Sequence, residues 1–440
     1  TFGRDAPGYY SHYDNALFHL ESCVFHFLYS QLMRLLVPFV LARFWWQGRH
    51  APALRQNLGQ RLGLVQRYSQ PVIWVHTASV GEAIAAGPMV RRLLVRKLDA
   101  RILVTAMTDT GLAQARKMFG GDVDYSYVPL DTPGSVRRFL RMVNPKVAVV
   151  LETEIWPNII GQCHKQNVPV FLINARLSER SARGYERVRG LARPIMRKIT
   201  WIAAQAEKDA DRFRRIGVAP ASVEVTGSVK FDVDITEGVR NAAHQCRQML
   251  GERPVWVAGS THSGEDEQLL EAHRVVLAKH PQALLVIVPR HPDRFDSVAE
   301  LAEKAGFILA RRSLQQDPAS AQVYLGDTMG ELMMLYGAGD MAFVGGSLVE
   351  RGGHNPLEPA AWGIPVLSGP YVFNFETVYE HLRAGDGVAM VQASDDLGRT
   401  VARLMASQKE RQALGERALA VVNKNRGALD KVVEGIIERL

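Results

Sequence analysis

A short motif early in the chain, Ser79-Val80-Gly81-Glu82, has the residue types and spacing for acid–base chemistry. Its glutamate could act as a general base at a helix start, accepting a proton from a bound hydroxyl group. Ser-x-x-Glu is also the spacing of a capping box, in which both side chains satisfy backbone groups of the first helical turn. A carboxylate tied to its own backbone cannot fully serve both roles, and the spacing alone favours the cap.

Two more acids, Glu152 and Glu154, directly follow the apolar run 147–151. Acids that precede a proline at a helix start suit the positive end of the helix dipole. Acids at the carboxyl end of a parallel strand are equally well placed for a reaction centre. The sequence does not separate these interpretations. Lys230 would ordinarily be a solvated lysine, and nothing in its local sequence argues otherwise.

The second half of the chain contains groups that suit a nucleotide. Arg290 follows an apolar run on a proline-flanked turn, where a guanidinium group can pair with phosphate. The segment 326–331 precedes a predicted helix, whose free amides can bind a phosphate or a base. The dinucleotide fingerprint G-x-G-x-x-G is absent from the sequence, which argues against a dehydrogenase.

A glycine-rich stretch leads into a second helix start at 352–358. Asn355 has the position of an N-cap, Pro356 that of the first helical residue and Glu358 that of a reciprocal cap. Glycines in this approach allow a backbone to come close to a ligand. A glutamate one turn into the helix could instead hydrogen-bond the hydroxyl groups of a ribose.

The elements that position these motifs are short apolar runs separated by amphipathic segments. This alternation predicts parallel sheets with helices on both faces. It occurs twice, and at 440 residues the chain is long enough for two domains. Strands are predicted at 72–76, 102–107, 125–129, 147–151, 168–173 and 199–204, and then at 255–259, 284–289, 323–325, 341–345 and 365–367.

The two halves resemble each other at their first strands. Each runs from a Trp-Val pair through a turn of small residues into a helix with an early glutamate, at 74–82 and at 256–265. Two Rossmann-like doubly wound domains facing a cleft describe the α/β architecture called GT-B. We therefore predict one domain at 47–235, a polar linker at 236–253 and a second domain at 254–440.

An apolar segment at 24–46 precedes the first domain. A spanning helix needs about 20 mainly apolar residues, and Arg34 near the middle would cost about 2.5–3.5 kcal/mol on insertion scales. Because His26, Ser30 and Arg34 recur at helical spacing, we expect a membrane-anchor helix with one polar stripe and the catalytic body on the cytoplasmic side. The alternative is a buried core helix. Residues 1–23 are expected to form an N-terminal extension that need not be ordered.

The formal net charge of +8 favours anionic partners. Basic residues cluster beside the apolar segment without a recognisable nucleic-acid motif, so no nucleic-acid partner is expected. Three widely spaced cysteines form neither a disulfide framework nor a metal site, and a reducing compartment is expected. No metal or other cofactor is predicted.

Five of these segments occur in an order that points to a known family. Together they closely resemble the bacterial 3-deoxy-D-manno-octulosonic acid (Kdo) transferase of lipopolysaccharide core biosynthesis, from about residue 24 to the C-terminus. The segments are HTASVGE at 76–82, ETEIWPN at 152–158, NARLS at 174–178, TGSVKFD at 226–232 and FVGGSLVERGGHNPLE at 343–358.

The resemblance implies an inverting enzyme that uses CMP-Kdo and adds Kdo to the tetraacylated lipid A precursor, lipid IVA, at the cytoplasmic face of the inner membrane. It implies an acceptor role for the first domain and CMP-Kdo binding by the second. It implies that Glu82 is the general base, against the preference for a cap, and that Glu152 and Lys230 stabilise the transition state. The CMP site that it implies consists of Pro289, Arg290, Met329, Gly330, Glu331, Asn355, Pro356, Leu357 and Glu358.

Two alternatives remain open from the sequence. One is a GT-B transferase with a uridine nucleotide donor and another lipid acceptor, and the other is a membrane-held sugar-nucleotide-binding protein without transferase activity. For the acceptor, our hypothesis is that Arg176 or Arg180 meets one of its phosphates. Such basic stretches could instead be solvated faces attracted to anionic headgroups, at about 1 kcal/mol per residue.

Overall fold

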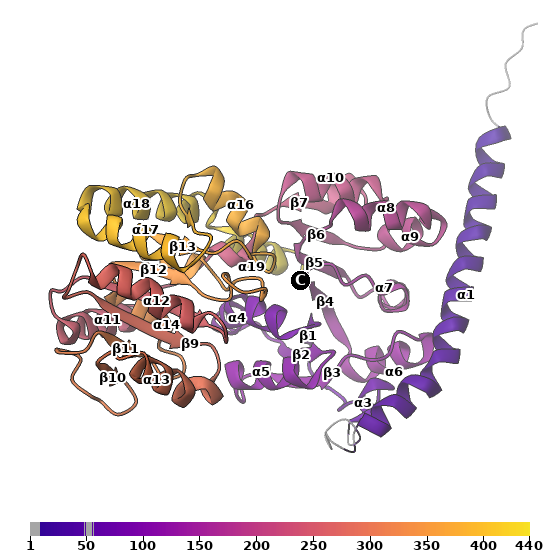
Figure 1. The fold of residues 1–440 in the computed structure, drawn as a ribbon. Helices are drawn as coiled ribbons and strands as arrows, with labels where there is room; N and C mark the ends of the chain where they lie inside the picture. The colour runs from indigo at the N-terminus through magenta and orange to yellow at the C-terminus, as the bar shows by residue number, and fades with distance from the viewer. Residues whose placement is uncertain (1–8, 48, 50–54, 56) are drawn as a thin grey trace, which may run out of the picture. The chain divides into compact units, whose positions relative to one another are not determined.

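The computed structural model describes residues 9–47, 49, 55 and 57–440. These residues form two compact units (Figure 1). The first contains the chain up to Val229 together with Gly427–Leu440, and the second contains Lys230–Arg426. This division differs from the predicted one, because the chain crosses between units at 229–230 and crosses back at 426–427.

The first unit is built on a seven-stranded parallel sheet in the order β3-β2-β1-β4-β5-β6-β7. The order reverses between β1 and β4, which makes their carboxyl ends the switch point where such sheets bind ligands. The strands are β1 (Val72–Thr77), β2 (Arg101–Ala106), β3 (Asp124–Tyr127), β4 (Pro145–Leu151), β5 (Val170–Ala175), β6 (Trp201–Ala204) and β7 (Val223–Val225).

Helices cover both faces of this sheet, because successive residues of its strands point to opposite sides. Trp74 of β1 packs on Phe139 with ring centroids 4.8 Å apart, whereas Ile73 belongs to the core on the other face. The helices are α3 (Leu58–Arg61), α4 (Val80–Val95), α5 (Asp109–Phe119), α6 (Pro133–Val143), α7 (Pro157–Lys165), α8 (Glu179–Arg187), α9 (Arg189–Met196), α10 (Glu207–Arg215) and α19 (Ala428–Glu438), with 3-10 turns at Pro220–Ser222 and Val229–Phe231.

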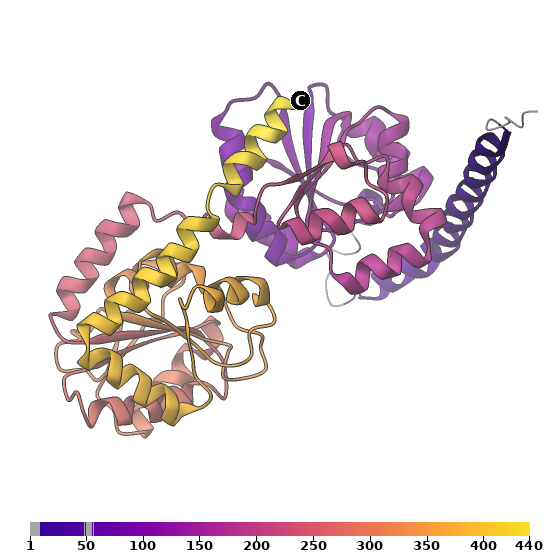
Figure 2. The same cartoon turned by 90° about the horizontal axis from the view of Figure 1, so that it is seen from above.

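The C-terminal helix α19 explains the second crossing. Its buried face, which includes Leu429, Val432 and Ile436, joins the core that contains Ile73 of β1. Figure 2 shows this helix among the elements of the first unit. The prediction that 254–440 forms one domain is therefore corrected at its last helix.

The second unit has the same kind of sheet, in the order β10-β11-β9-β8-β12-β13-β14, and all of its strand pairs are parallel. Its switch point lies between β8 and β12. The strands are β8 (Val255–Thr261), β9 (Leu284–Pro289), β10 (Leu309–Arg311), β11 (Val323–Leu325), β12 (Met341–Val344), β13 (Val366–Ser368) and β14 (Ala389–Met390).

The helices of the second unit include one in the predicted linker. In α11 (Glu237–Leu250), Ala243, Cys246 and Leu250 are buried in a core with β8. Most of 236–253 is therefore a packed helix and not a linker, and it was predicted as a linker because its exposed residues are polar. The others are α12 (Asp266–Leu277), α13 (Phe295–Lys304), α14 (Leu332–Ala338), α15 (Leu357–Ala361), α16 (Glu376–Ala384), α17 (Ser394–Ala406) and α18 (Gln408–Asn425), with a 3-10 turn at Pro292–Arg294.

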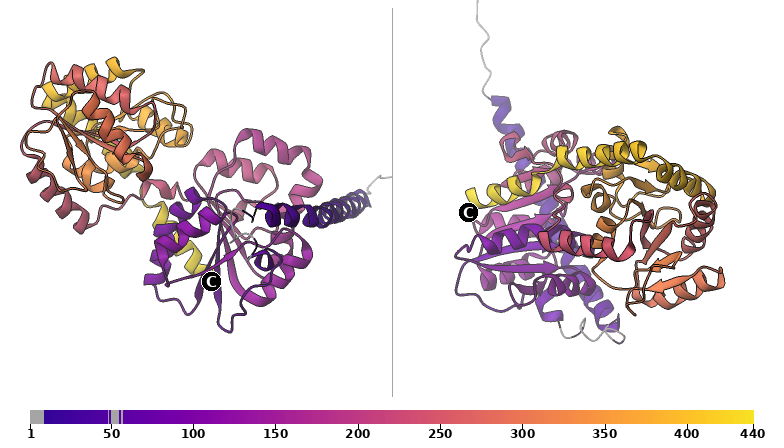
Figure 3. Two further views of the ribbon diagram at one scale, coloured as in Figure 1. Left: turned by 60° about the horizontal axis from the view of Figure 1, so that its bottom comes forward. Right: turned by 90° about the vertical axis from the view of Figure 1, so that its left-hand side faces the viewer.

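A long N-terminal helix, α1 (Tyr9–Gln47), extends from the first unit (Figure 3). It begins before the predicted anchor, so the extension 1–23 is helical from Tyr9 onward, and residues 1–8 lie outside the described residues. Its segment His26–Trp46 has a mean hydropathy of 1.3 and is long and apolar enough to cross a membrane. Leu35 and Phe39 are 70% and 73% exposed, which does not fit the alternative of a buried core helix.

Candidate active site

The first candidate site lies at the switch point of the first unit. The paired strands β1 and β4 end beside each other, and the segments that follow them carry Glu82 and Glu152–Glu154. Both Glu152 and Glu154 are close enough to Glu82 to act on its ionisation. The fold therefore brings together acids that are about 70 residues apart in the sequence, as expected for carboxyl ends of neighbouring parallel strands.

Glu82 forms the capping box that its sequence predicts. Ser79 is the N-cap of α4, and its Oγ accepts a hydrogen bond from the Glu82 amide at 3.3 Å. In return, one carboxylate oxygen of Glu82 accepts from the Ala78 amide at 2.7 Å and the other from the Ser79 hydroxyl at 3.1 Å. Each oxygen has a second lone pair, so the cap does not by itself prevent proton acceptance.

Burial and neighbouring charges also change the acidity of the Glu82 carboxyl group. Its residue is only 9% exposed, and burial raises the pKa of Glu82 to about 7, with a further upward contribution from the charges of Glu152 and Glu154. The hydrogen bonds from Ala78 and Ser79 oppose this rise. A base with a pKa near the working pH is the most effective general base.

Glu152 holds an unusual backbone conformation. Its φ is +55°, a left-handed conformation that costs of order 1–3 kcal/mol for a non-glycine residue and persists only where the surroundings enforce it. The Glu152 amide donates to the Ile173 carbonyl at 2.9 Å, and the hydroxyl of Thr153 bonds the carbonyl of Arg176. The segments after β4 and β5 are thus joined.

Burial raises the pKa of Glu154, which the family resemblance did not include among the site residues.

Asn174, at the end of β5, binds the two residues that precede Lys230 in the chain. Its buried side-chain oxygen accepts from the Ser228 hydroxyl at 3.2 Å and from the Val229 amide at 3.3 Å. Lys230 is the next residue and the first of the second unit. It is half-buried in the 3-10 turn Val229–Phe231, and its Nζ lies 5.8 Å from the ring centroid of Phe375. Lys230 therefore stands where the chain passes from one unit to the other.

The second candidate site lies at the switch point of the second unit and depends on a buried glutamate. Glu265 is fully buried and accepts hydrogen bonds from the amides of Gly346, Ser347 and Leu348 at 2.7–3.0 Å. It also accepts from the His262 amide at 3.2 Å. This glutamate, the counterpart of Glu82 in the second half, shapes the glycine-rich loop after β12.

Arg290 and the 355–358 segment meet at this edge. Arg290 follows β9, its amide donates to Thr261 at 3.0 Å, and its charge partly offsets the rise in the pKa of Glu358 that burial causes. Asn355 accepts from the Leu357 amide at 3.1 Å and donates to Glu358 at 3.3 Å. The helix begins at Leu357 rather than at Pro356, although Asn355 still supplies the capping bond.

The segment 329–331 lies on the turn before α14. Gly330 has a φ of +89°, which glycine adopts readily, and Met329 is half exposed. The carboxylate of Glu331 pairs with Arg312 and bonds Thr328. The Glu331 side chain is therefore already bonded within the protein, so the groups of this turn that remain for a ligand are those of its backbone.

Sequence reasoning missed a histidine cluster beside Arg290. The Nε2 atoms of His262 and His354 are 2.8 Å apart with stacked rings, and the His291 ring stands edge-on to His262 at 5.5 Å. Burial, together with the neighbouring positive groups, lowers the pKa of both His262 and His354 to about 4. Both rings are therefore neutral at pH 7. The sequence did offer one indication of this cluster, because His262 and His354 follow the strands β8 and β12, whose carboxyl ends form the switch point.

The acceptor candidates Arg176 and Arg180 are both exposed. Arg176 follows β5, and Arg180 lies in the first turn of α8. Part of the basic stretch around them is neutralised, because Glu179 pairs with Arg183, Arg212 and Arg215.

Among the described residues, no group of three or more His, Cys, Asp or Glu side chains is arranged to hold a metal ion.

Comparisons with known proteins identify the family. Residues 56–233 match the family model described as 3-deoxy-D-manno-octulosonic-acid transferase (kdotransferase), and residues 266–421 match glycosyl transferases group 1. The 3-deoxy-D-manno-octulosonic acid transferase of Haemophilus influenzae is 40% identical over 417 residues, which cover 93% of this chain and 98% of that protein. This chain belongs to the Kdo transferase family.

Other similarities agree with this assignment. The Bordetella pertussis 3-deoxy-D-manno-octulosonic acid transferase is 34% identical, with 93% of this chain and 98% of that protein covered. The UDP-GlcNAc 2-epimerase structure from Neisseria meningitidis covers 84% of this chain and 100% of its own, with a TM-score of 0.55 at 16% identity. That likeness supports the fold alone. The predictions of a GT-B fold and of a Kdo transferase of lipopolysaccharide core biosynthesis are confirmed.

Proposed function

We propose that this transferase moves Kdo from CMP-Kdo onto a hydroxyl group of the tetraacylated lipid A precursor, with inversion at the transferred carbon and with Glu82 as general base. The observation that carries the proposal is the pKa of Glu82, which burial and neighbouring acids raise to about 7 at the carboxyl edge of β1. A sugar hydroxyl is a poor nucleophile and needs a base as it attacks.

The chemistry is a single displacement. The acceptor oxygen forms a bond to the anomeric carbon of Kdo, its proton passes to Glu82, and the bond between that carbon and the CMP phosphate breaks, with the electron pair leaving on CMP. With a pKa of about 7, about half of the Glu82 side chains are ionised at neutral pH, and each is a stronger base than an exposed glutamate.

Glu152 and Lys230 stabilise the transition state in this proposal. The donor sugar develops oxocarbenium character as CMP leaves, and a nearby carboxylate such as Glu152 lowers the energy of that positive charge. Lys230 offsets the charge of the Kdo carboxylate or of the departing phosphate. Support comes from the strained backbone at Glu152 and from the bonds of Asn174 to the residues directly before Lys230.

The second unit binds the donor. Arg290 and the backbone amides of the 329–331 turn supply positive charge for the CMP phosphate, and the half-buried Glu358 accepts from the ribose hydroxyls. Glu265 keeps the loop after β12 in the required shape through the three amides that it binds. The remaining proposed CMP contacts are Pro289, Met329, Gly330, Glu331, Asn355, Pro356 and Leu357.

The helix α1 anchors the enzyme at the cytoplasmic face of the inner membrane. Its apolar side chains are exposed over the segment that has the length of a membrane span. A lipid acceptor is most accessible to an enzyme held at the bilayer surface. We assign Arg176 or Arg180, both exposed, to one acceptor phosphate.

The experiment is to incubate the purified full chain with the lipid A precursor and either CMP-Kdo or a uridine-nucleotide sugar, and to weigh the lipid products by mass spectrometry. The proposal predicts a mass increase of one or more Kdo units with CMP-Kdo alone. Transfer from the uridine nucleotide would replace the donor assignment. Donor binding without any change in lipid mass would contradict the proposed reaction.

A further inference from the structure

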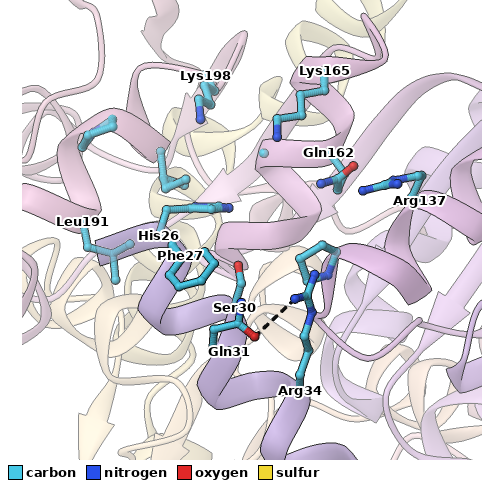
Figure 4. Close-up of a pocket in the computed structure, with 14 residues that line it drawn as sticks. His26, Phe27, Ser30, Gln31, Arg34, Arg137, Gln162, Lys165, Leu191 and Lys198 are labelled. Carbon is cyan, nitrogen blue, oxygen red and sulfur yellow. Dashed lines mark hydrogen bonds between the residues drawn. The ribbon is translucent and has the colours of Figure 1, made fainter. Parts of the chain in front are cut away.

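A cavity of about 390 Å³ lies between the N-terminal helix α1 and the helices α6, α7 and α9 of the first unit (Figure 4). Its size falls within the range of small-ligand sites. The predicted polar stripe of α1 forms one wall, since His26, Ser30 and Arg34 all line the cavity. None of these helices contributes a residue to the CMP site proposed above.

The cavity is strongly basic. Its lining includes Arg34, Arg137, Lys165 and Lys198, and the lining residues that the structure describes include no aspartate or glutamate. Figure 4 shows Arg137, Lys165 and Lys198 with their nitrogen-bearing ends turned toward the space beside α1. Cations gathered around one space repel each other, and a bound anion relieves that repulsion.

The wall formed by α1 is held in place by buried polar contacts. The Ser30 hydroxyl donates to Asn158 Oδ1 at 2.8 Å, and the Tyr29 hydroxyl donates to Asp131 Oδ2 at 2.8 Å. Asp131 also accepts from the amides of Asn158 and Ile159 at 3.1 and 2.7 Å. The cavity is therefore a built feature of the first unit, because these bonds fix α1 against the start of α7.

The cavity also has an apolar side. Phe27 and Leu191 line it, and Phe27, Leu28 and Leu32 on α1 are each more than half exposed. A ligand that fits both sides carries a negative group and hydrocarbon. Phosphate attached to an acylated lipid has this combination, since a guanidinium or ammonium group pairs well with phosphate and acyl chains can cover the exposed side chains.

We propose that this cavity binds a phosphate group of the acylated acceptor, as a second phosphate subsite besides Arg176 or Arg180. The inference rests on the proposed function, whose acceptor, the tetraacylated lipid A precursor, is a lipid with two phosphate groups. The position of α7 favours the acceptor over a bulk phospholipid, because this helix begins three residues after Glu154 and its last residue, Lys165, lines the cavity. At 1.5 Å per residue, Lys165 lies on the order of 12 Å along the helix from its start.

The test uses Arg137→Gln, Lys165→Gln and the double variant of the full chain in detergent without phospholipid. The proposal predicts that the acceptor KM rises about tenfold for each variant, the expected cost of losing a charge-assisted contact, while kcat and the CMP-Kdo KM stay unchanged. With an acceptor that lacks one phosphate, the variants and the wild type should have the same KM if the missing phosphate is the one in the cavity. Both monophosphorylated forms are therefore compared.

The matched control is Lys146→Gln, which removes an exposed lysine of the same unit at the amino end of β4 and should leave the acceptor KM unchanged. Unchanged acceptor kinetics in the cavity variants, with weaker binding to phosphatidylglycerol vesicles, would assign the cavity to bilayer headgroups and overturn the proposal. A KM rise that persists with both monophosphorylated acceptors would also overturn it. Absence of Kdo transfer by the wild type would instead refute the proposed function itself.

Discussion

Glu82→Gln should stabilise the protein above neutral pH. Burial of Glu82 raises its pKa from 4.5 to about 7, so the folded chain keeps a proton that the unfolded chain loses between these two values. The protein is therefore destabilised as the pH rises through that window, and the full cost is present above pH 7. A shift of this size corresponds to about 3 kcal/mol.

The substitution removes the ionisation and keeps the size of the side chain. At pH 8 the variant should therefore be more stable by up to about 3 kcal/mol, equivalent to several degrees in Tm for a unit of this size. At pH 5, where Glu82 is protonated in the folded state, the two proteins should unfold at nearly the same temperature. Thermal unfolding from pH 5 to 8.5, followed by calorimetry, measures the difference.

Glu237→Gln is the matched control, because Glu237 is also a first-turn glutamate but is exposed. It should show no stabilisation that grows with pH. If Glu82 were only a charged helix cap, its loss would lower the Tm at pH 8, since a carboxylate at a helix N-terminus is stabilising. A Tm of Glu82→Gln below that of the wild type at pH 8 would refute the reasoning.

Three further predictions concern neighbouring groups. Ser79→Ala should cost about 1 kcal/mol of stability. In the wild type the hydrogen bond from Ser79 lowers the pKa of Glu82, so its loss should raise that pKa and move the acid limb of the pH–rate profile to higher pH. A shift to lower pH would contradict this. Glu265→Ala should lower stability by about 3 kcal/mol or more, since buried loop amides lose their acceptor, as thermal unfolding would detect. Glu358→Ala should weaken CMP binding about tenfold in calorimetry, and equal affinity would remove the ribose assignment.

The strands of both sheets were largely predictable because parallel strands buried on both faces are continuous apolar runs. The missed strands, β7, β10 and β14, are two- or three-residue strands at sheet edges and are partly exposed, so they lack a continuous apolar run. The equally short β11 and β13 lie inside their sheet, are fully buried, and were predicted. The sheet against which each helix packs was harder to predict from the sequence. The apolar residues of α19 recur at helical spacing and so indicate a buried face, but this spacing does not say which of the two sheets covers that face. In the structure α19 packs on the sheet of the first unit.

The site was predictable where its geometry is local. The capping bonds between Ser79 and Glu82 follow directly from their spacing. The raised pKa of Glu82 depends on burial and on acids about 70 residues away, and the contact between His262 and His354 spans 92 residues. Contacts of this kind follow from sheet order, which the family resemblance supplied indirectly and the spacing of residues did not.

The most direct test of the central claim is the rate of Kdo transfer by Glu82→Gln, measured by product mass with CMP-Kdo and the lipid A precursor. General base catalysis by this residue predicts a loss of about 10²–10⁴ in kcat, with CMP affinity and the folded state retained. Transfer by a well-folded Glu82→Gln enzyme at a rate close to that of the wild type would contradict the account and leave Glu82 with its capping role alone.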